Sequence, residues 1–367
     1  MEQDFEAARL TVRLDAIADN YRSFRRLAGP AAVGAVVKAD AYGLGAAKVA
    51  PALAQAGCDS FFVARLEEGV TLRALLPEAR IFVLDGAPPD AVPALLSHAL
   101  TPVLNSLADI ASWGAAASAA RTSLDAVLHI DTGMNRLGLA ADELAILSAE
   151  HASRLAGLSL SLVMSHLACS DDPGAAMNGE QLSRFRTALA MLPPAPASLA
   201  ASGGVLLGKD YHFDMVRPGI GLYGGNPQPG GENPMKPAAV LTGRVLGLRR
   251  IDMGESVGYA ATFRAKRPSM LATVALGYAD GIPRAASNRG AAAIGGARVP
   301  FAGRVSMDLV CLDITDLPFE PKSGDMVQFL GDTITVDDAA AAAGTSAYEI
   351  LTRLGQRLPR HYRDGGA

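Results

Sequence analysis

The sequence predicts an α/β fold in which eight parallel strands alternate with helices and close into a barrel, followed by a second, mostly β domain. Two observations carry this prediction. Eight short apolar runs alternate with longer amphipathic segments from about Ala31 to Gly225, and short runs of β-forming residues dominate the chain beyond about Asn233. At 367 residues the chain is long enough for two such domains.

Composition narrows the classes of protein that fit. Hydrophobic residues make up 50% of the chain and charged residues 19%, which excludes global disorder. A net charge of -4 without a basic block argues against a nucleic-acid partner. The three cysteines lie far apart, without a Cys-x-x-Cys pair, so we expect reduced thiols and no metal. Acidic Glu2, Asp4 and Glu6 and the lack of a long apolar window predict a soluble cytoplasmic protein with no membrane contact.

The first domain is expected to be the barrel. Apolar runs roughly 15 to 35 residues apart suit a strand, a crossover helix and two loops. The runs are Ala32–Val37, Ser60–Ala64, Arg80–Leu84, Leu100–Leu104, Leu124–Ile130, Gly157–Met164, Pro196–Ala201 and Met215–Tyr223. Helical periodicity is evident in Ala46–Ala56, Leu66–Leu76, Asp142–His151 and Gly179–Leu192. An open doubly wound sheet is the alternative, but no Gly-x-Gly-x-x-Gly follows the first run.

A Pro- and Gly-rich stretch, Gln228–Pro237, predicts the domain boundary. We therefore place the barrel in residues 1–235 and the β-rich domain in residues 236–367. The strands expected in the second domain are Val240–Leu248, Val257–Phe263, Leu271–Leu276, Ala297–Phe301, Leu309–Ile314, Met326–Leu330 and Thr333–Val336. The tail from Ser346 to Leu354 is expected to be helical.

Reactive side chains of a parallel barrel gather at the carboxyl ends of its strands. Lys38 directly follows the first apolar run. Loss of hydration there would lower the pKa of its amine and suit it to forming a Schiff base. The alternative is a lysine whose ammonium simply reaches solvent.

Four other strand ends also carry polar residues: Arg136, His166, Ser202 and Arg217. Each has an ordinary structural explanation, such as a surface arginine or a serine helix cap. Five such residues at five carboxyl ends are harder to dismiss. Ser202 and the Gly219-Ile220 backbone would offer hydroxyl and N–H donors to a phosphate, and barrels favour a phosphate site after strands 7 and 8. An amine-reactive lysine opposite a phosphate site predicts pyridoxal 5′-phosphate as cofactor.

At this point the sequence resembles a known family. Val37-Lys-Ala-Asp-Ala-Tyr-Gly-Leu-Gly45 is similar to the pyridoxal-phosphate attachment signature of alanine racemases, and the resemblance runs over nearly the whole chain. Further matches, in order, are Asp131-Thr-Gly-Met-Asn-Arg136, Met164-Ser-His166, Val216-Arg-Pro-Gly-Ile-Gly-Leu-Tyr-Gly224, Val257-Gly-Tyr259, Gly277-Tyr-Ala-Asp-Gly281, Gly303-Arg-Val-Ser-Met-Asp308 and Leu354-x-x-Arg-Leu-Pro-Arg-x-Tyr362. The family's fold is an eight-stranded α/β barrel followed by a β domain, as read above.

The resemblance implies a role for each matching residue. Lys38 would be the Schiff-base lysine and one catalytic base, and Tyr259, from the partner subunit of a head-to-tail homodimer, the other. Pyridoxal phosphate would further contact Tyr42, His166, Ser202, Arg217, Gly219, Ile220 and Tyr348. The substrate carboxylate would meet Arg136 and the backbone of Met307, and Tyr278 would line the entrance. A chain through His166 to Arg217 would bring positive charge toward Tyr259.

The activity so implied is interconversion of L-alanine and D-alanine, serving either supply of D-alanine for cell-wall precursors or its breakdown. Two departures from the family pattern stand out. Leu44 replaces a histidine, and His129 replaces a lysine that is often carbamylated and orients the arginine at position 136. We expect a chloride or a hydrogen bond from His129 to hold Arg136 instead.

Two alternatives stay open. A basic-amino-acid decarboxylase of the same fold would use a cysteine motif in the β domain, but the residues around Cys311 lack the glycines of that motif. A non-catalytic pyridoxal-phosphate carrier would have no use for Tyr259 or for a β domain.

Overall fold

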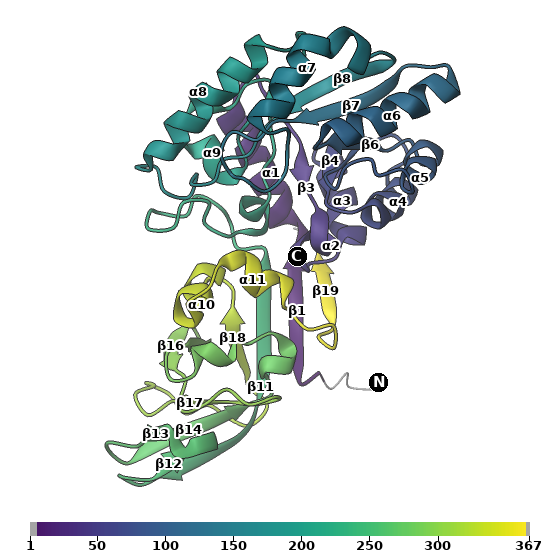
Figure 1. Ribbon diagram of the computed structural model, residues 1–367. Coiled ribbons are helices and arrows are strands. Elements are labelled where there is room, and N and C mark those ends of the chain that lie inside the picture. Colours follow the sequence, from purple (N-terminus) through teal and green to yellow (C-terminus); the bar gives the residue numbers. More distant parts are fainter. Residues whose placement is uncertain (1–5, 365–367) are drawn as a thin grey trace.

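The computed structural model describes residues 6–364, so Glu2 and Asp4 of the N-terminal reading lie outside the described residues. Figure 1 shows two regions, one of helices around a parallel sheet and one of mostly antiparallel strands. No helix within residues 6–364 is long and apolar enough to cross a membrane.

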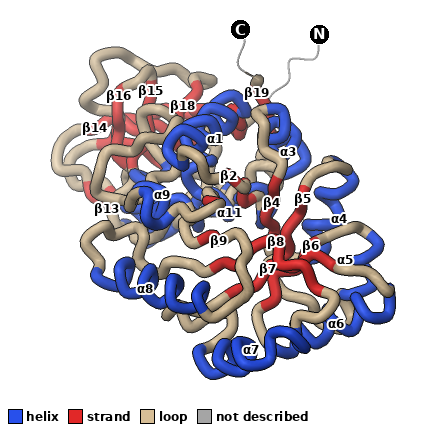
Figure 2. Tube along the Cα trace, turned by 90° about the horizontal axis from the view of Figure 1, so that it is seen from above, coloured by secondary structure: helices blue, strands red, loops and turns tan. Residues whose placement is uncertain are grey.

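The first region is built on a curled seven-stranded parallel sheet. Its strands, in order, are β3 (Ala35–Val36), β4 (Ser60–Val63), β5 (Arg80–Val83), β6 (Thr101–Leu104), β7 (Leu124–His129), β8 (Leu158–Met164) and β9 (Ala197–Ser198). Figure 2 shows the helices arranged around the outside of these strands. They are α1 (Leu14–Ala28), α3 (Ala46–Gln55), α4 (Leu66–Leu75), α5 (Val92–Ser97), α6 (Leu107–Ala120), α7 (Ala141–Arg154), α8 (Ala176–Ala190) and α9 (Ser202–Leu206). The predicted alternation of strands and helices is confirmed.

A two-stranded pair lies beside this sheet. β10 (Met215–Val216) pairs in parallel with β2 (Ala32–Val33). Backbone hydrogen bonds also run from Asp214 N to Ala197 O at 3.0 Å and from Arg217 N to Ala200 O at 2.9 Å, which places β10 between β9 and β2. All eight predicted apolar runs therefore contain a parallel strand, while the closed eight-stranded barrel stays a prediction.

Large side chains fill the interior between these strands. Phe62, Phe82, Val103, Val127, Leu162, Met164 and Met215 form one buried cluster, drawn from most of the strands. The rings of Phe62 and Phe82 stack with centroids 4.6 Å apart. Gly34 lies between β2 and β3, where a side chain does not fit, because a Cβ there would lie 2.6 Å from the Phe62 ring. The packed side chains between the strands thus support the carboxyl ends of the strands.

The second region contains an eight-stranded sheet. Its strands are β1 (Ala8–Arg13), β11 (Ala239–Ile251), β14 (Ser269–Val274), β15 (Ala291–Ile294), β16 (Ala297–Pro300), β17 (Val310–Asp313), β18 (Met326–Leu330) and β19 (Arg360–Arg363). The first strand of the chain, β1, pairs antiparallel with β11 and parallel with β19. The first and last strands within residues 6–364 therefore both belong to this sheet, which the sequence reading did not anticipate.

Two predicted strands were wrong. Val257–Phe263 is a short hairpin of β12 (Ser256–Val257) and β13 (Phe263–Arg264), with the single turn η3 (Tyr259–Ala261) between them. Thr333–Val336 leads into helix α10 (Val336–Ala343), because Thr335 Oγ1 accepts a hydrogen bond from Asp338 N while the Asp338 carboxylate accepts one from Thr335 N. The tail prediction is confirmed as α11 (Ala347–Thr352).

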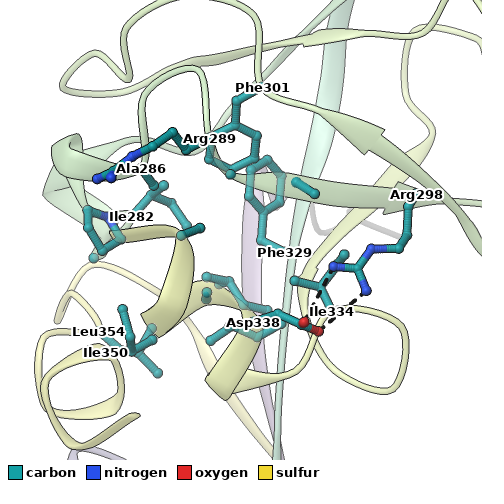
Figure 3. A pocket seen from close by; sticks show the side chains of 18 residues that line it. Ile282, Ala286, Arg289, Arg298, Phe301, Phe329, Ile334, Asp338, Ile350 and Leu354 are labelled. Carbon is teal, nitrogen blue, oxygen red and sulfur yellow. Dashed lines mark hydrogen bonds and ion pairs between the residues drawn. The ribbon is translucent and has the colours of Figure 1, made fainter. Parts of the chain in front are cut away.

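The second region also encloses a cavity of about 80 Å³ between α10, α11 and the sheet. Apolar side chains such as Phe301, Phe329 and Ile350 line it. Figure 3 shows Arg298 reaching across to Asp338 at its edge, a pair 3.5 Å apart. None of the site residues predicted from the sequence lines this cavity.

Candidate active site

Lys38 begins a short turn, α2 (Lys38–Tyr42), directly after β3. Residues 39–42 all have φ between 52° and 57°, which makes the segment left-handed. For residues with a Cβ this conformation costs about 1–2 kcal/mol each, so contacts from outside must hold it. Glu68 accepts a hydrogen bond from Ala39 N at 2.5 Å, and Arg360 donates to Gly43 O at 3.2 Å. The position of Lys38 therefore depends on a strained turn held at both ends.

The surroundings of Lys38 favour its neutral form. Burial, and then the positive charge of Arg136, lower the pKa of the amine. Glu68 and Asp85 act in the opposite direction, because their negative charges favour the ammonium. A lowered pKa leaves more free amine near neutral pH, and free amine is the nucleophilic form. The predicted lysine thus has the expected environment.

Three tyrosine rings stand beside this turn. The Tyr42 ring lies 4.7 Å from that of Tyr223 and 5.8 Å from that of Tyr348, which is carried by α11. A Cβ on Gly219 would lie 2.3 Å from the Tyr42 hydroxyl, so only glycine leaves room there. The Tyr223 hydroxyl donates to Val36 O, whereas those of Tyr42 and Tyr348 bond no other described residue. Two hydroxyls are left to bind a ligand.

Ser202 lies at the start of α9 and is buried. Its Oγ accepts hydrogen bonds from Gly219 N at 2.9 Å and Gly221 N at 3.3 Å. Because these donors occupy the oxygen's lone pairs, the hydroxyl proton is left to donate outward. The chain continues from Gly219 into the turn η2 (Ile220–Tyr223). The structure thus brings Ser202, Gly219, Ile220 and Tyr42 together, but the Gly219 N–H bonds Ser202 Oγ instead of pointing to a free phosphate site.

Arg217 is 3% exposed and sits at the end of β10. Nη1 donates to Ser198 Oγ, and Nη2 donates to Ser165 O at 2.6 Å. Burial lowers the pKa of Arg217 to about 10, which still leaves it cationic near neutral pH. These two hydrogen bonds therefore hold a buried, positively charged side chain in one orientation.

His166 follows β8, close to this arginine. Burial, and then the charges of Arg217 and Arg136, lower the pKa of His166 to about 3. The imidazole is therefore neutral near pH 7. Arg217 donates to Ser165 O and Ser198 Oγ, and no hydrogen bond joins His166 to Arg217 within residues 6–364. The interaction between His166 and Arg217 is therefore electrostatic, without a hydrogen bond between them.

His129, at the end of β7, bonds Asn105 rather than Arg136: Nδ1 lies 2.8 Å from Asn105 Oδ1. The Asn105 amide nitrogen donates to Leu84 O and Val103 O, which fixes the amide and assigns the proton to His129 Nδ1. Burial, and then Arg217, lower the pKa of His129 to about 4. Arg136 is exposed and makes no hydrogen bond to another described residue. The expected hydrogen bond from His129 to Arg136 is therefore wrong for this structure.

The remaining predicted residues gather on the second region. Tyr259 is 71% exposed, Met307 53% and Tyr278 43%. Tyr278 N donates to Ser306 O, and Ala279 N to Met307 O, both at 3.0 Å, so these two loops lie together. Figure 1 shows β12 and β13, which flank Tyr259, at the end of this region farthest from α2. Within one chain, Tyr259 does not approach Lys38.

Sequence reasoning missed several supporting residues. Glu68, Asn105, Ser165 and Ser198 position the predicted ones but carry no chemistry of their own. None of them had a readable signal: Glu68 lies three positions after the cap of α4, but that cap is Arg65 and not the Ser, Thr, Asp or Asn of a capping box. No group of three or more His, Cys, Asp or Glu side chains in the described part of the chain is arranged to hold a metal.

Comparisons with known proteins find alanine racemases over nearly the whole chain. The family model "Alanine racemase, N-terminal domain" matches residues 12–227, and "Alanine racemase, C-terminal domain" matches residues 238–362. The alanine racemase of Rhodospirillum rubrum is 50% identical over 98% of this chain and 97% of its own length. A catabolic alanine racemase from Agrobacterium fabrum is 49% identical, over 97% of this chain and 92% of its own.

Solved structures give the same result. The alanine racemase of Bartonella henselae with covalently bound pyridoxal phosphate superposes with a TM-score of 0.93 and 40% identity, covering 98% of this chain and all of that one. The biosynthetic alanine racemase of Pseudomonas aeruginosa gives 0.90 and 39%, with the same coverage. With two domain matches in order, half-identical relatives and superposable structures, this chain belongs to the alanine racemase family.

Proposed function

We propose that this protein is a pyridoxal-phosphate-dependent racemase that interconverts L-alanine and D-alanine. One observation carries the proposal. A half-buried lysine with a lowered pKa stands beside unpaired hydroxyls in a chain of the alanine racemase family. The decarboxylase and the carrier gain no support, because the curated relatives of this chain are named as racemases.

The chain's own donors fit the cofactor. The hydroxyls of Tyr42 and Tyr348 have no hydrogen-bond partner within residues 6–364, and the Ser202 hydroxyl has a free proton. With the backbone N–H group of Ile220 they would hold the phosphate, and Gly219 would contribute by holding Ser202 Oγ in place through its own N–H. Lys38 would bind the aldehyde carbon, Arg217 would face the pyridine nitrogen, and His166 would stand beside it. When bound, the cofactor accepts the electron pair that an α-carbon keeps when its proton leaves.

The residues of the chain move the proton. The Lys38 amine would take or return it on one face of the α-carbon, which its lowered pKa permits near neutral pH. Tyr259 of the partner subunit would serve the opposite face. Removal on one face and return on the other inverts the carbon. The exposed Arg136 guanidinium and the Met307 backbone would bind the substrate carboxylate.

Arg217 would set the electronics of the pyridine nitrogen. It stays cationic although burial lowers its pKa to about 10, and its two hydrogen bonds hold it in place. A fixed cation at this point would disfavour protonation of the ring nitrogen. The neutral His166 adds no positive charge of its own.

The protein would act as a head-to-tail homodimer. Tyr259, Met307 and Tyr278 are exposed on the second region, which leaves them available to a partner subunit. The parallel strands would close into an eight-stranded barrel through β10, and each barrel would receive the Tyr259 face of its partner. Two identical, shared active sites follow from this symmetry.

The test is racemisation of a panel of L-amino acids by the purified protein, with and without added pyridoxal phosphate. We expect L-alanine to lose its optical activity fastest, with no release of carbon dioxide, and Lys38→Ala or Tyr259→Phe to abolish turnover. Carbon dioxide release from basic amino acids, or cofactor binding without turnover, would overturn the proposal.

A further inference from the structure

The left-handed turn that carries Lys38 has one charged contact at its amino end. Glu68, on α4, accepts the hydrogen bond from Ala39 N at 2.5 Å through Oε1. Ala39 is the residue directly after the lysine and has φ 52°. A hydrogen bond to an ionised acceptor is stronger than one to a neutral acceptor, so it offsets part of the cost of the left-handed residues.

The same carboxylate also holds a second loop. Its other oxygen, Oε2, accepts from Ala64 N at 2.8 Å and from Arg65 N at 3.1 Å, both just after β4. Glu68 therefore ties together the loops that follow the first and second strands of the sheet. None of the cationic side chains in the described residues forms a salt bridge with it, so its charge is not neutralised by direct pairing.

Four charged or titratable groups surround the Lys38 amine, each from a different element. Arg136 comes from the loop after β7, Asp85 follows β5, Glu68 lies on α4, and the neutral His166 follows β8. Glu68 and Asp85 favour the ammonium, and Arg136 and burial oppose it. Among the two carboxylates, only Glu68 also touches the backbone of the turn.

We propose that Glu68 is a positioning residue for Lys38: its carboxylate fixes the left-handed turn through the Ala39 N–H and ties this turn to the loop after β4. This inference rests on the proposed function, in which Lys38 binds the cofactor and acts as a base. In this proposal Glu68 acts through the turn that carries Lys38 and not by contact with substrate or cofactor.

Two variants separate geometry from charge. Glu68→Gln removes the charge, and its amide NH2 group would face N–H donors on one of the two loops. Glu68→Asp keeps the charge but is one methylene shorter, so it cannot span both loops. Glu67→Gln is the matched control, because Glu67 is the neighbouring residue, exposed on the same turn of α4.

The measurement is equilibrium binding of pyridoxal 5′-phosphate to the cofactor-free protein, followed by visible absorbance over a pH series, with thermal unfolding of each variant. We expect Glu68→Gln to weaken binding about tenfold or more and to shift the pH midpoint of covalent attachment downward, because the amine loses a neighbouring negative charge. Glu68→Asp should weaken binding while keeping a midpoint near that of wild type. Glu67→Gln should match wild type in both.

Folded Glu68→Gln protein with the affinity and midpoint of Glu67→Gln would overturn the inference, whatever its unfolding temperature, because Glu68 would then only cap α4. Failure of the proposed function would look different. In that case the wild-type protein itself would show no covalent attachment or no racemisation.

Discussion

The free energy of unfolding should fall in mild acid because His129, buried beside Arg217, is neutral in the folded protein. Burial first, and then Arg217, lower the pKa of His129 from 6.5 to about 4. Between pH 6.5 and about pH 4 the imidazole of His129 is protonated in the unfolded chain but stays neutral in the folded protein. The stability that neutral His129 contributes is therefore fully present above pH 6.5 and is lost as the pH falls toward 4. One proton is worth about 1.4 kcal/mol per pH unit in this window, which gives a loss of about 2 kcal/mol at pH 5 and about 3 kcal/mol at pH 4.

The variant that isolates this loss is His129→Gln, because its amide can still donate to Asn105 Oδ1 but cannot take up a proton. We expect the free energy of unfolding in urea to fall by about 2 kcal/mol more for wild type than for His129→Gln between pH 7 and pH 5. His151→Gln is the control, since His151 is exposed on α7 and its replacement should leave the wild-type slope. Parallel pH profiles for wild type and His129→Gln would refute the reasoning, since the difference between them cancels every other titrating group.

Other substitutions test the cofactor cradle. Ser202→Ala leaves the buried N–H groups of Gly219 and Gly221 without their acceptor, at about 1–3 kcal/mol each, and removes a phosphate donor. The dissociation constant of pyridoxal phosphate should rise at least about tenfold, and an unchanged constant by absorbance titration would contradict the assignment. Arg217→Glu should allow the pyridine nitrogen to take up a proton and so raise transamination relative to racemisation. Pyruvate formed per racemisation event measures this ratio, and an equal ratio in both proteins would count against the role of Arg217.

The sequence was most informative at the ends of the short apolar runs, where a polar residue directly follows a predicted strand. Buried parallel strands are short and apolar, so their carboxyl ends could be located, and with them Lys38, His166, Ser202 and Arg217. The phosphate donors were equally accessible, because glycines beside a serine are needed where backbones approach closely. Gly203, next to Ser202, shows this need directly, because a Cβ there would lie 2.6 Å from the backbone oxygen of Ser170.

Other features depend on contacts between distant parts of the chain. Four consecutive non-glycine residues with positive φ cannot be inferred from Ala-Asp-Ala-Tyr, because Glu68 and Arg360 hold that conformation from outside. The pairing of β1 with β11 and β19 depends equally on tertiary structure, and nothing local distinguishes β1 from a barrel strand. Val257–Phe263 reads as a strand because its β-formers flank a turn.

A subunit-complementation assay tests the shared active site most directly. Lys38→Ala and Tyr259→Phe proteins, each inactive alone, are unfolded together, refolded as a mixture and assayed with L-alanine. Random pairing makes half of the dimers mixed, and each mixed dimer has one site with both bases intact. The account therefore predicts recovery of about a quarter of the wild-type activity. A mixture that stays as inactive as its two components would contradict it, because the amine and the phenol would then have to come from the same chain.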